Sequence, residues 1–125
     1  MQRRWAAEDG MLCLIVRDAD NAFVGDVNAH WMEEFEEGVD EPELLLEVDV
    51  MICNVRHRRQ GHAGRALQLL FQLLSELESL KGATLVAKIK LGNEASMGLF
   101  RKLGFEQKSV SEVFQEATFV RPLMI

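Results

Sequence analysis

The run from Glu47 to Gly64 holds the residue types best suited to bind a charged ligand. Its first part, Val48–Val55, is apolar and strand-like, and it leads into a basic turn, Arg56–Gln60, that ends in Gly-His-Ala-Gly at 61–64. Small residues at such a junction let backbone N–H groups approach a ligand closely. A helix that begins there adds unpaired donors and a partial positive charge. We therefore expect a phosphate or pyrophosphate site here, with an ordinary turn and a solvated basic run as the alternative.

Two carboxylates and a cysteine lie close to this junction. Glu47 and Asp49 alternate with valines, so they share one face of the predicted strand. A carboxylate beside the cleft could accept a proton from an amine, and Glu47 is the first candidate for that catalytic role; the alternative is an exposed polar strand face. Cys53 has apolar neighbours and no evident histidine partner, which predicts a buried thiol and not a nucleophile.

The remaining residue types that can carry chemistry form no recognisable site. The three histidines, at positions 30, 57 and 62, are too scattered for a zinc site, so we expect no metal. The aromatic residues Phe100, Phe105 and Phe114 are predicted to lie in the core or in a pocket wall.

Hydrophobic periodicity predicts eight elements that must position these residues. Apolar and alternating runs bounded by turn residues indicate strands, and apolar residues at helical spacing from Ala63 to about Leu80 indicate a long helix. Asn93 is predicted to cap a second helix, which Gly104 ends. The predicted elements are strands 11–17, 23–31 and 44–55, helix 63–80, strand 83–89, helix 94–103, and strands 105–111 and 113–120. The order β-β-β-α-β-α-β-β predicts a mixed α/β (α+β) sheet in a single domain over residues 1–125.

Composition and charge limit the classes of function. With 125 residues, of which 48% are hydrophobic, the chain can bury one core. A net charge of −6 argues against a general nucleic-acid binder, although the basic turn keeps that reading as a rival. No apolar run reaches the roughly 20 residues of a membrane span, and residues 1–10 lack the apolar centre of a signal peptide. Two cysteines in apolar runs fit free thiols in a reducing compartment, so we expect a cytoplasmic protein.

Several short motifs occur in a fixed order along the second half of the chain. Residues 58–63 (RRQGHA), 93–100 (NEASMGLF) and 103–105 (LGF) resemble the coenzyme A pyrophosphate loop, the next helix start and the following turn of the Gcn5-related N-acetyltransferase (GNAT) superfamily. The runs EVDVMI at 47–52, AKI at 87–89 with GNE at 92–94, FEQ at 105–107, SVS at 109–111 and VFQE at 113–116 resemble the N-acetyltransferase 9-like family more closely. The resemblance implies the acyl-CoA N-acyltransferase-like fold, a mixed and mostly antiparallel sheet with two helices.

The resemblance also implies a co-substrate and an acceptor. Acetyl-CoA would place its pyrophosphate on the turn and its pantetheine arm along the strand edge at Met51–Cys53, and a protein amine, either an N-terminus or a lysine, would receive the acetyl group. The implied cofactor-binding residues are Met51, Ile52, Cys53, Arg58, Arg59, Gln60, Gly61, His62, Ala63, Gly64, Asn93 and Phe100. The closer family points to tubulin or microtubules as a partner; neither nucleic acid nor a membrane is expected as one.

Two departures from the superfamily's pattern bear on activity. Many members have a tyrosine where this chain has Phe100, and that tyrosine is the usual acid for the leaving thiolate; this chain contains no tyrosine. The chain also begins near the hairpin, so we expect it to lack the usual first strand and two helices, which line the acceptor site. A non-catalytic module that binds acetyl-CoA or a protein is therefore the alternative to an N-acetyltransferase. An unpaired sheet edge makes a homodimer a further hypothesis.

Overall fold

The secondary structure follows the predicted order. The computed structural model describes residues 11–17, 19–21, 23–31, 44–52, 61–77, 80 and 82–123. The elements are β1 (Met11–Arg17), β2 (Phe23–Trp31), β3 (Leu45–Ile52), α1 (His62–Ser75), β4 (Thr84–Lys90), α2 (Glu94–Lys102), β5 (Glu106–Ser111) and β6 (Glu116–Pro122). The bounds of β1 and β2 are those predicted from the sequence.

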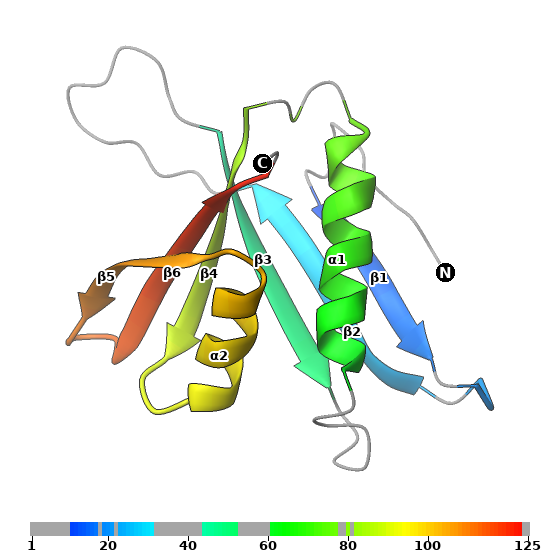
Figure 1. Ribbon diagram of the computed structural model, residues 1–125, viewed down its shortest axis with the longest axis horizontal. Helices are drawn as coiled ribbons and strands as arrows, with labels where there is room; N and C mark the ends of the chain where they lie inside the picture. Colours follow the sequence, from blue (N-terminus) through cyan, green and yellow to red (C-terminus); the bar gives the residue numbers. More distant parts are fainter. Residues whose placement is uncertain are drawn as a thin grey trace.

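The six strands form one sheet in the order β1-β2-β3-β4-β6-β5. Every neighbouring pair is antiparallel except β3 and β4, which run parallel. Both helices lie on the same face of the sheet, where α1 covers β1, β2 and β3, and α2 packs on β4 (Figure 1). The predicted mixed, mostly antiparallel sheet with two helices is therefore confirmed.

A short ladder joins the two halves of the sheet. β3 and β4 pair over Leu45–Glu47 and Thr84–Val86, and the Thr84 N–H donates to the Leu44 carbonyl at 2.9 Å. Past these residues β3 stays paired with β2 up to Ile52, and β4 stays paired with β6 up to Lys90. The two strands consequently diverge, and the N-terminal ends of both helices lie at the open end of the resulting V (Figure 1).

Alternate residues of the strands build one core beneath the helices. Leu46 of β3 and Leu85 of β4 are paired in the ladder, and both side chains are fully buried. The largest fully buried side chains come from both halves of the sheet and from α1, and they include Leu12, Leu46, Leu67, Leu70, Leu74, Leu80, Leu85 and Phe119. No polar or charged side chain among the described residues is buried. A single apolar core therefore spans the point where the two halves meet.

Helix α1 is shorter than the predicted helix. It ends at Ser75 instead of about Leu80, and the chain continues in tighter turns. The N–H groups of Leu77 and Leu80 donate to the carbonyls of Leu74 and Leu77 at 3.1 and 3.0 Å, the i→i−3 pattern of a 3₁₀ turn. Leu80 is nevertheless fully buried. The apolar spacing thus predicted the burial of Leu80 correctly but not its conformation.

The closing hairpin also differs from the prediction. β6 begins at Glu116 instead of position 113, because residues 112–115 form the turn and Gln115 adopts a positive φ of 52°. The Phe114 N–H donates to the Ser111 hydroxyl at 3.2 Å, and the Phe114 side chain is 72% exposed. Its predicted place in the core or a pocket wall is therefore wrong, whereas Phe100 and Phe105 are buried as predicted.

Truncation of Leu46 to alanine should destabilise the fold strongly, because the side chain is fully buried at the ladder. Removal of a buried leucine side chain typically costs about 2–5 kcal/mol of unfolding free energy. Urea unfolding followed by circular dichroism measures the difference. The control is Leu91→Ala, at a leucine that is 39% exposed, which should cost much less. Equal losses in the two variants would contradict the role given to Leu46 in the core.

Candidate functional site

The described part of the predicted phosphate loop is the start of α1. Gly61 is the N-cap, with a φ of 79° in the left-handed region, and as a glycine it supplies no side-chain cap to the helix. His62 and Ala63 begin the helix, whose first turn contains no acidic residue. The Arg65 side chain donates to the Gly61 carbonyl at 3.4 Å. Since the N–H groups of Ala63 and Gly64 have no acceptor within the helix, they can serve an anion.

Gly64 allows the two helices to approach each other. A Cβ atom added at Gly64 would lie 3.4 Å from the Leu99 Cδ1 atom of α2. An alanine there would just touch Leu99, and a side chain larger than alanine would push the first turn of α1 away from α2. The small residue at this position, which directly follows the loop motif at 58–63, therefore has a packing function.

Asn93 caps α2 as predicted. Its side-chain oxygen accepts a hydrogen bond from the Ser96 N–H at 3.2 Å, and the residue is exposed directly before the helix. Phe100, further along the same helix, is only 3% exposed, and its ring packs edge-on against Phe105 with centroids 5.0 Å apart. A cofactor contact by either Asn93 or Phe100 stays a prediction.

The strand residues predicted to face the cofactor lie where β3 has parted from β4. Met51 and Ile52 follow the ladder, and Met51 is 58% exposed. Four other predicted residues fall outside the described part of the chain: Cys53, Arg58, Arg59 and Gln60. Their contacts, and those of Met51 and Ile52, stay predictions.

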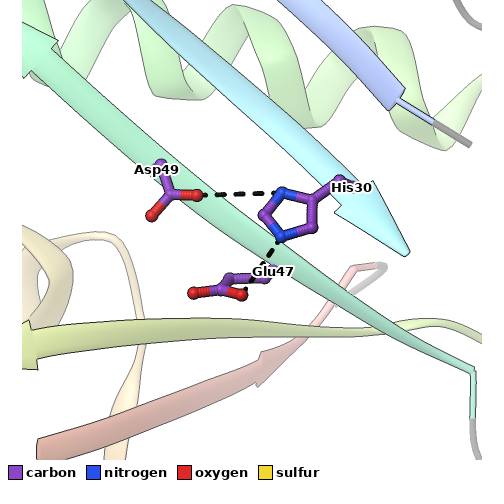
Figure 2. A group of neighbouring side chains, drawn as sticks. All are labelled: His30, Glu47 and Asp49. Carbon is purple, nitrogen blue, oxygen red and sulfur yellow. Dashed lines mark hydrogen bonds and ion pairs between the residues drawn. The ribbon is translucent and has the colours of Figure 1, made fainter. Parts of the chain in front are cut away.

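The face of the sheet away from the helices carries a cluster that the sequence did not reveal. His30 on β2 is paired in register with Glu47 on β3, and their side chains lie beside that of Asp49 (Figure 2). The His30 Nε2 atom is 3.1 Å from Glu47 Oε2, and the His30 Nδ1 atom is 3.8 Å from Asp49 Oδ2. Glu47, the predicted catalytic base, is therefore hydrogen-bonded to an imidazole.

Strand register brings this cluster together across 17 residues of chain. Polar residues alternate along β2 at Asp26, Asn28 and His30, and along β3 at Glu47 and Asp49. This alternation indicates a polar face on each strand, and it was a usable signal. It does not indicate which residues of the two strands lie opposite each other, because register is fixed by the fold.

The environment of Asp49 favours its protonated form. Burial raises the pKa of Asp49 above its ordinary value, and the carboxylate of Glu47 raises this pKa further. His30 lowers the pKa of Asp49 and Asp26 raises it, both to a smaller extent. The cluster thus contains a carboxyl group that takes up a proton more readily than a free aspartate does.

Two further observations bear on the predicted class of protein. Cys13 on β1 is a half-buried free thiol, and burial, followed by the charge of Asp26, raises the pKa of that thiol. A raised pKa makes the thiol a weaker nucleophile.

Neither helix in the described part of the chain is long and apolar enough to cross a membrane.

Residues 1–106 match the family model of the acetyltransferase (GNAT) domain. The chain is 34% identical to an N-acetyltransferase 9-like protein of Caenorhabditis briggsae over 128 residues, which cover 98% of this chain and 63% of that protein. It is 33% identical to the alpha/beta-tubulin-N-acetyltransferase 9 of Mus musculus over 129 residues, which cover 94% of this chain and 50% of that protein. The chain thus spans between half and two thirds of the length of these relatives.

Solved structures of acetyltransferases have a similar fold. A ribosomal-protein-alanine N-acetyltransferase from Brucella melitensis superposes with a TM-score of 0.69 at 24% identity, over 90% of this chain and 69% of that chain. Arabidopsis thaliana NAA60 in complex with acetyl-CoA superposes with a TM-score of 0.66 at 12% identity, over 96% and 85%. At these identities the likeness shows the fold alone.

Gly61→Ala should destabilise the protein, because a left-handed φ costs an L-residue about 1–2 kcal/mol. Gly98→Ala is the matched change in α2, where an added Cβ would meet nothing within 4 Å. It should stabilise the protein by about 0.5–1 kcal/mol, since alanine is the better helix former. Urea unfolding of both variants and of the unmodified chain measures the two changes in the free energy of unfolding. A Gly61→Ala protein as stable as the unmodified chain would show that the left-handed N-cap is not required.

Asp49→Asn should make the protein more stable at pH 7, because the folded state disfavours the charged carboxylate and so raises the pKa of Asp49. With a raised pKa, the unmodified protein gains stability from this group as the pH falls through the folded-state value. The advantage of the variant should therefore shrink between pH 7 and the ordinary aspartate value of about 3.9. Urea unfolding of the variant and of the unmodified protein across this pH range measures the difference in their free energies of unfolding. A pH-independent advantage, or a loss at pH 7, would contradict the direction of the shift.

Proposed function

Since this chain belongs to the GNAT acetyltransferase family, whose domain model matches residues 1–106, we propose that it is an N-acetyltransferase that transfers acetyl from acetyl-CoA to a protein amine. The observation that carries the proposal is the parting of β3 from β4 beyond Glu47, with the N-terminal ends of α1 and α2 at the open end (Figure 1). An elongated anionic ligand would meet a strand edge and two helix N-terminal ends together.

The parted edge of β3 suits the extended arm of coenzyme A. Beyond the ladder, the backbone of Met51 and Ile52 is no longer paired with β4, so an arm that contains amides can add to this edge as a strand does. Cys53 would continue the same edge. The pyrophosphate would meet the N–H donors of Gly61–Gly64, where the helix dipole favours negative charge. Further contacts would come from Arg58, Arg59, Gln60 and Asn93.

Catalysis in this site would come mainly from placing the amine against the thioester, which removes most of the entropic cost of their encounter. N–H groups on the parted edge of β3 would stabilise the charge that develops on the thioester oxygen. Glu47 would take up the proton of the amine, directly or through a water molecule. Because the chain contains no tyrosine, the thiolate would leave unprotonated or take its proton from water.

The acceptor that we propose is an amine of a protein, with tubulin as the first candidate. The mouse relative bears the name alpha/beta-tubulin-N-acetyltransferase, and tubulin offers both α-amino groups and lysine side chains to such chemistry. A cytoplasmic location belongs to the same proposal.

Calorimetric titration with acetyl-CoA tests the co-substrate. We expect a Kd in the micromolar range, on the order of typical KM values, and we expect Gly61→Glu to abolish binding because its carboxylate repels the pyrophosphate. Gly82→Glu is the matched control, since Gly82 also has a left-handed φ, of +83°, and precedes the end of β4 that is paired with β3. It should bind normally. A folded unmodified chain that does not bind, or equal loss in both variants, would overturn the proposed site.

Acetyl transfer to peptides tests the acceptor. Tubulin N-terminal peptides with a free amino group, the same peptides with a blocked N-terminus, and lysine-containing peptides form the panel, and mass spectrometry reports the modified position. We expect at least one class of amine to be acetylated in an enzyme-dependent manner. Acetyl-CoA binding without turnover on any of them would favour the non-catalytic module.

A further inference from the structure

His30 lies between two carboxylates on the face of the sheet opposite the helices (Figure 2). Its Nε2 atom lies 3.1 Å from Glu47 Oε2, a hydrogen-bond distance, and its Nδ1 atom lies 3.8 Å from Asp49 Oδ2. The side chains of His30, Glu47 and Asp49 are 38%, 22% and 47% exposed. The cluster is therefore ordered by contacts on one side and open to solvent on the other.

The two distances assign different functions to the two ring nitrogens. A carboxylate can only accept, so the neutral ring donates its Nε2–H to Glu47. The Nδ1 atom then carries a lone pair, and the 3.8 Å that separates it from Asp49 Oδ2 is too long for a direct hydrogen bond. This is the arrangement of a base that is oriented by a carboxylate. An ammonium group would fit beside Nδ1, donating one proton to that nitrogen and another to Asp49.

The position of the cluster relates it to the proposed acetyl site. Glu47 belongs to the last residue pair of the ladder, and Asp49 and Met51 follow on the same face of the parted strand. Two residues of a strand span about 6.6 Å. An amine held between His30 and Asp49 would therefore lie about one such two-residue step along β3 from Met51, where the thioester is proposed to bind.

We propose that His30 is the catalytic base of the acetyl transfer, with Glu47 orienting its ring and Asp49 holding the acceptor's ammonium group. This inference rests on the proposed function and goes beyond it by placing an imidazole between Glu47 and the amine. The acceptor would be a primary amine that arrives in its cationic form, because two carboxylates attract it.

The proton and electron balance of the step is simple. One proton of the acceptor's ammonium group moves to His30 Nδ1, and the ring becomes an imidazolium between two carboxylates. The freed lone pair attacks the thioester carbon, so that a C–N bond forms and the C–S bond breaks. The thiolate leaves with the electron pair of that bond, and the second amine proton passes to the thiolate or to water.

The same three residues could also be read as a metal site, since their ligating atoms lie within 4.8 Å of one another. The two ring nitrogens of His30, however, are directed at different carboxylates. A metal ion bound by all three residues would take one nitrogen only. If that nitrogen were Nε2, the ion would displace the hydrogen bond to Glu47, and if it were Nδ1, Glu47 would have to serve both the ion and the ring. The geometry therefore favours the base.

Kinetics of His30→Gln provide the first test. We expect acetyl-CoA binding, measured by calorimetry, to be unchanged, kcat to fall by about 10²–10⁴-fold, and the acid limb of the kcat/KM profile to disappear. Among the described residues, register places other titratable groups on the same face as His30: Cys13 on β1, Asp26 on β2, Glu47 and Asp49 on β3, Lys88 and Lys90 on β4, Glu106 on β5 and Glu116 on β6. Asn28→Ala, at the next residue on the same face of β2, is the control and should retain both kcat and the acid limb.

Two further measurements separate a base from a structural residue. In His30→Ala, added imidazole should restore part of the lost kcat, whereas it should not affect Asn28→Ala. Long-range ¹H–¹⁵N NMR of the unmodified chain should show His30 as the Nε2–H tautomer, and assignment is direct because the chain has only three histidines and His30→Gln removes one signal.

The outcomes distinguish the inference from the function on which it rests. An unmodified chain that binds and turns over acetyl-CoA, together with a His30→Gln variant of normal kcat and unchanged acid limb, would overturn the inference alone. The Nδ1–H tautomer would do the same, as would activity that is lost on chelation and restored by Zn²⁺. An unmodified chain without acetyl-CoA binding or turnover would overturn the proposed function and the inference together.

Discussion

Three residue pairs between β3 and β4 hold the two halves of the sheet together. One half consists of β1, β2 and β3, and the other of β4, β6 and β5, and within each half all neighbouring strands pair antiparallel. Every strand thus has a hydrogen-bonded partner in its own half, so a long backbone ladder between the halves is not required. The buried pair Leu46 and Leu85 lies in this ladder and belongs to the core that continues beneath both helices. Apolar burial therefore compensates for the short run of backbone pairing, and the strands can part immediately beyond Glu47 without exposing the core.

The parting of these strands gives the two faces of the sheet different functions in the proposed enzyme. On the helical face, α1 begins at Gly61, which has no side chain to cap the helix, and α1 approaches α2 at Gly64. The first N–H groups of α1 therefore lie as donors at the open end of the V. On the other face, His30, Glu47 and Asp49 gather where the ladder ends. A coenzyme A thioester lying between the diverging strands would have its pyrophosphate bound on the helical face. The acceptor amine would approach its carbonyl carbon from the other face.

The helices and strands were predictable because each depends mainly on the pattern of residues within its own segment. The hairpin strands, the apolar stripe of α1 and the Asn93 cap of α2 follow from periodicity and turn chemistry, and the structure confirms them. The early end of α1 and the exposure of Phe114 were not predictable, since both depend on where the chain turns in the folded protein. The contact between His30 and Glu47 could not be predicted either. It depends on the register between β2 and β3, which the residues of either strand alone do not determine.

The parted edge of β3 and the start of α1 together form the binding surface that we propose for coenzyme A. Amide hydrogen exchange with and without acetyl-CoA, resolved by NMR, tests whether both segments bind the ligand. We expect acetyl-CoA to slow exchange at both Val48–Ile52 and Gly61–Gly64, while amides of β1 and β5, at the outer edges of the sheet, exchange as before. Binding that leaves the amides of Val48–Ile52 unprotected would show that the ligand does not lie between the strands and would contradict the proposed binding surface.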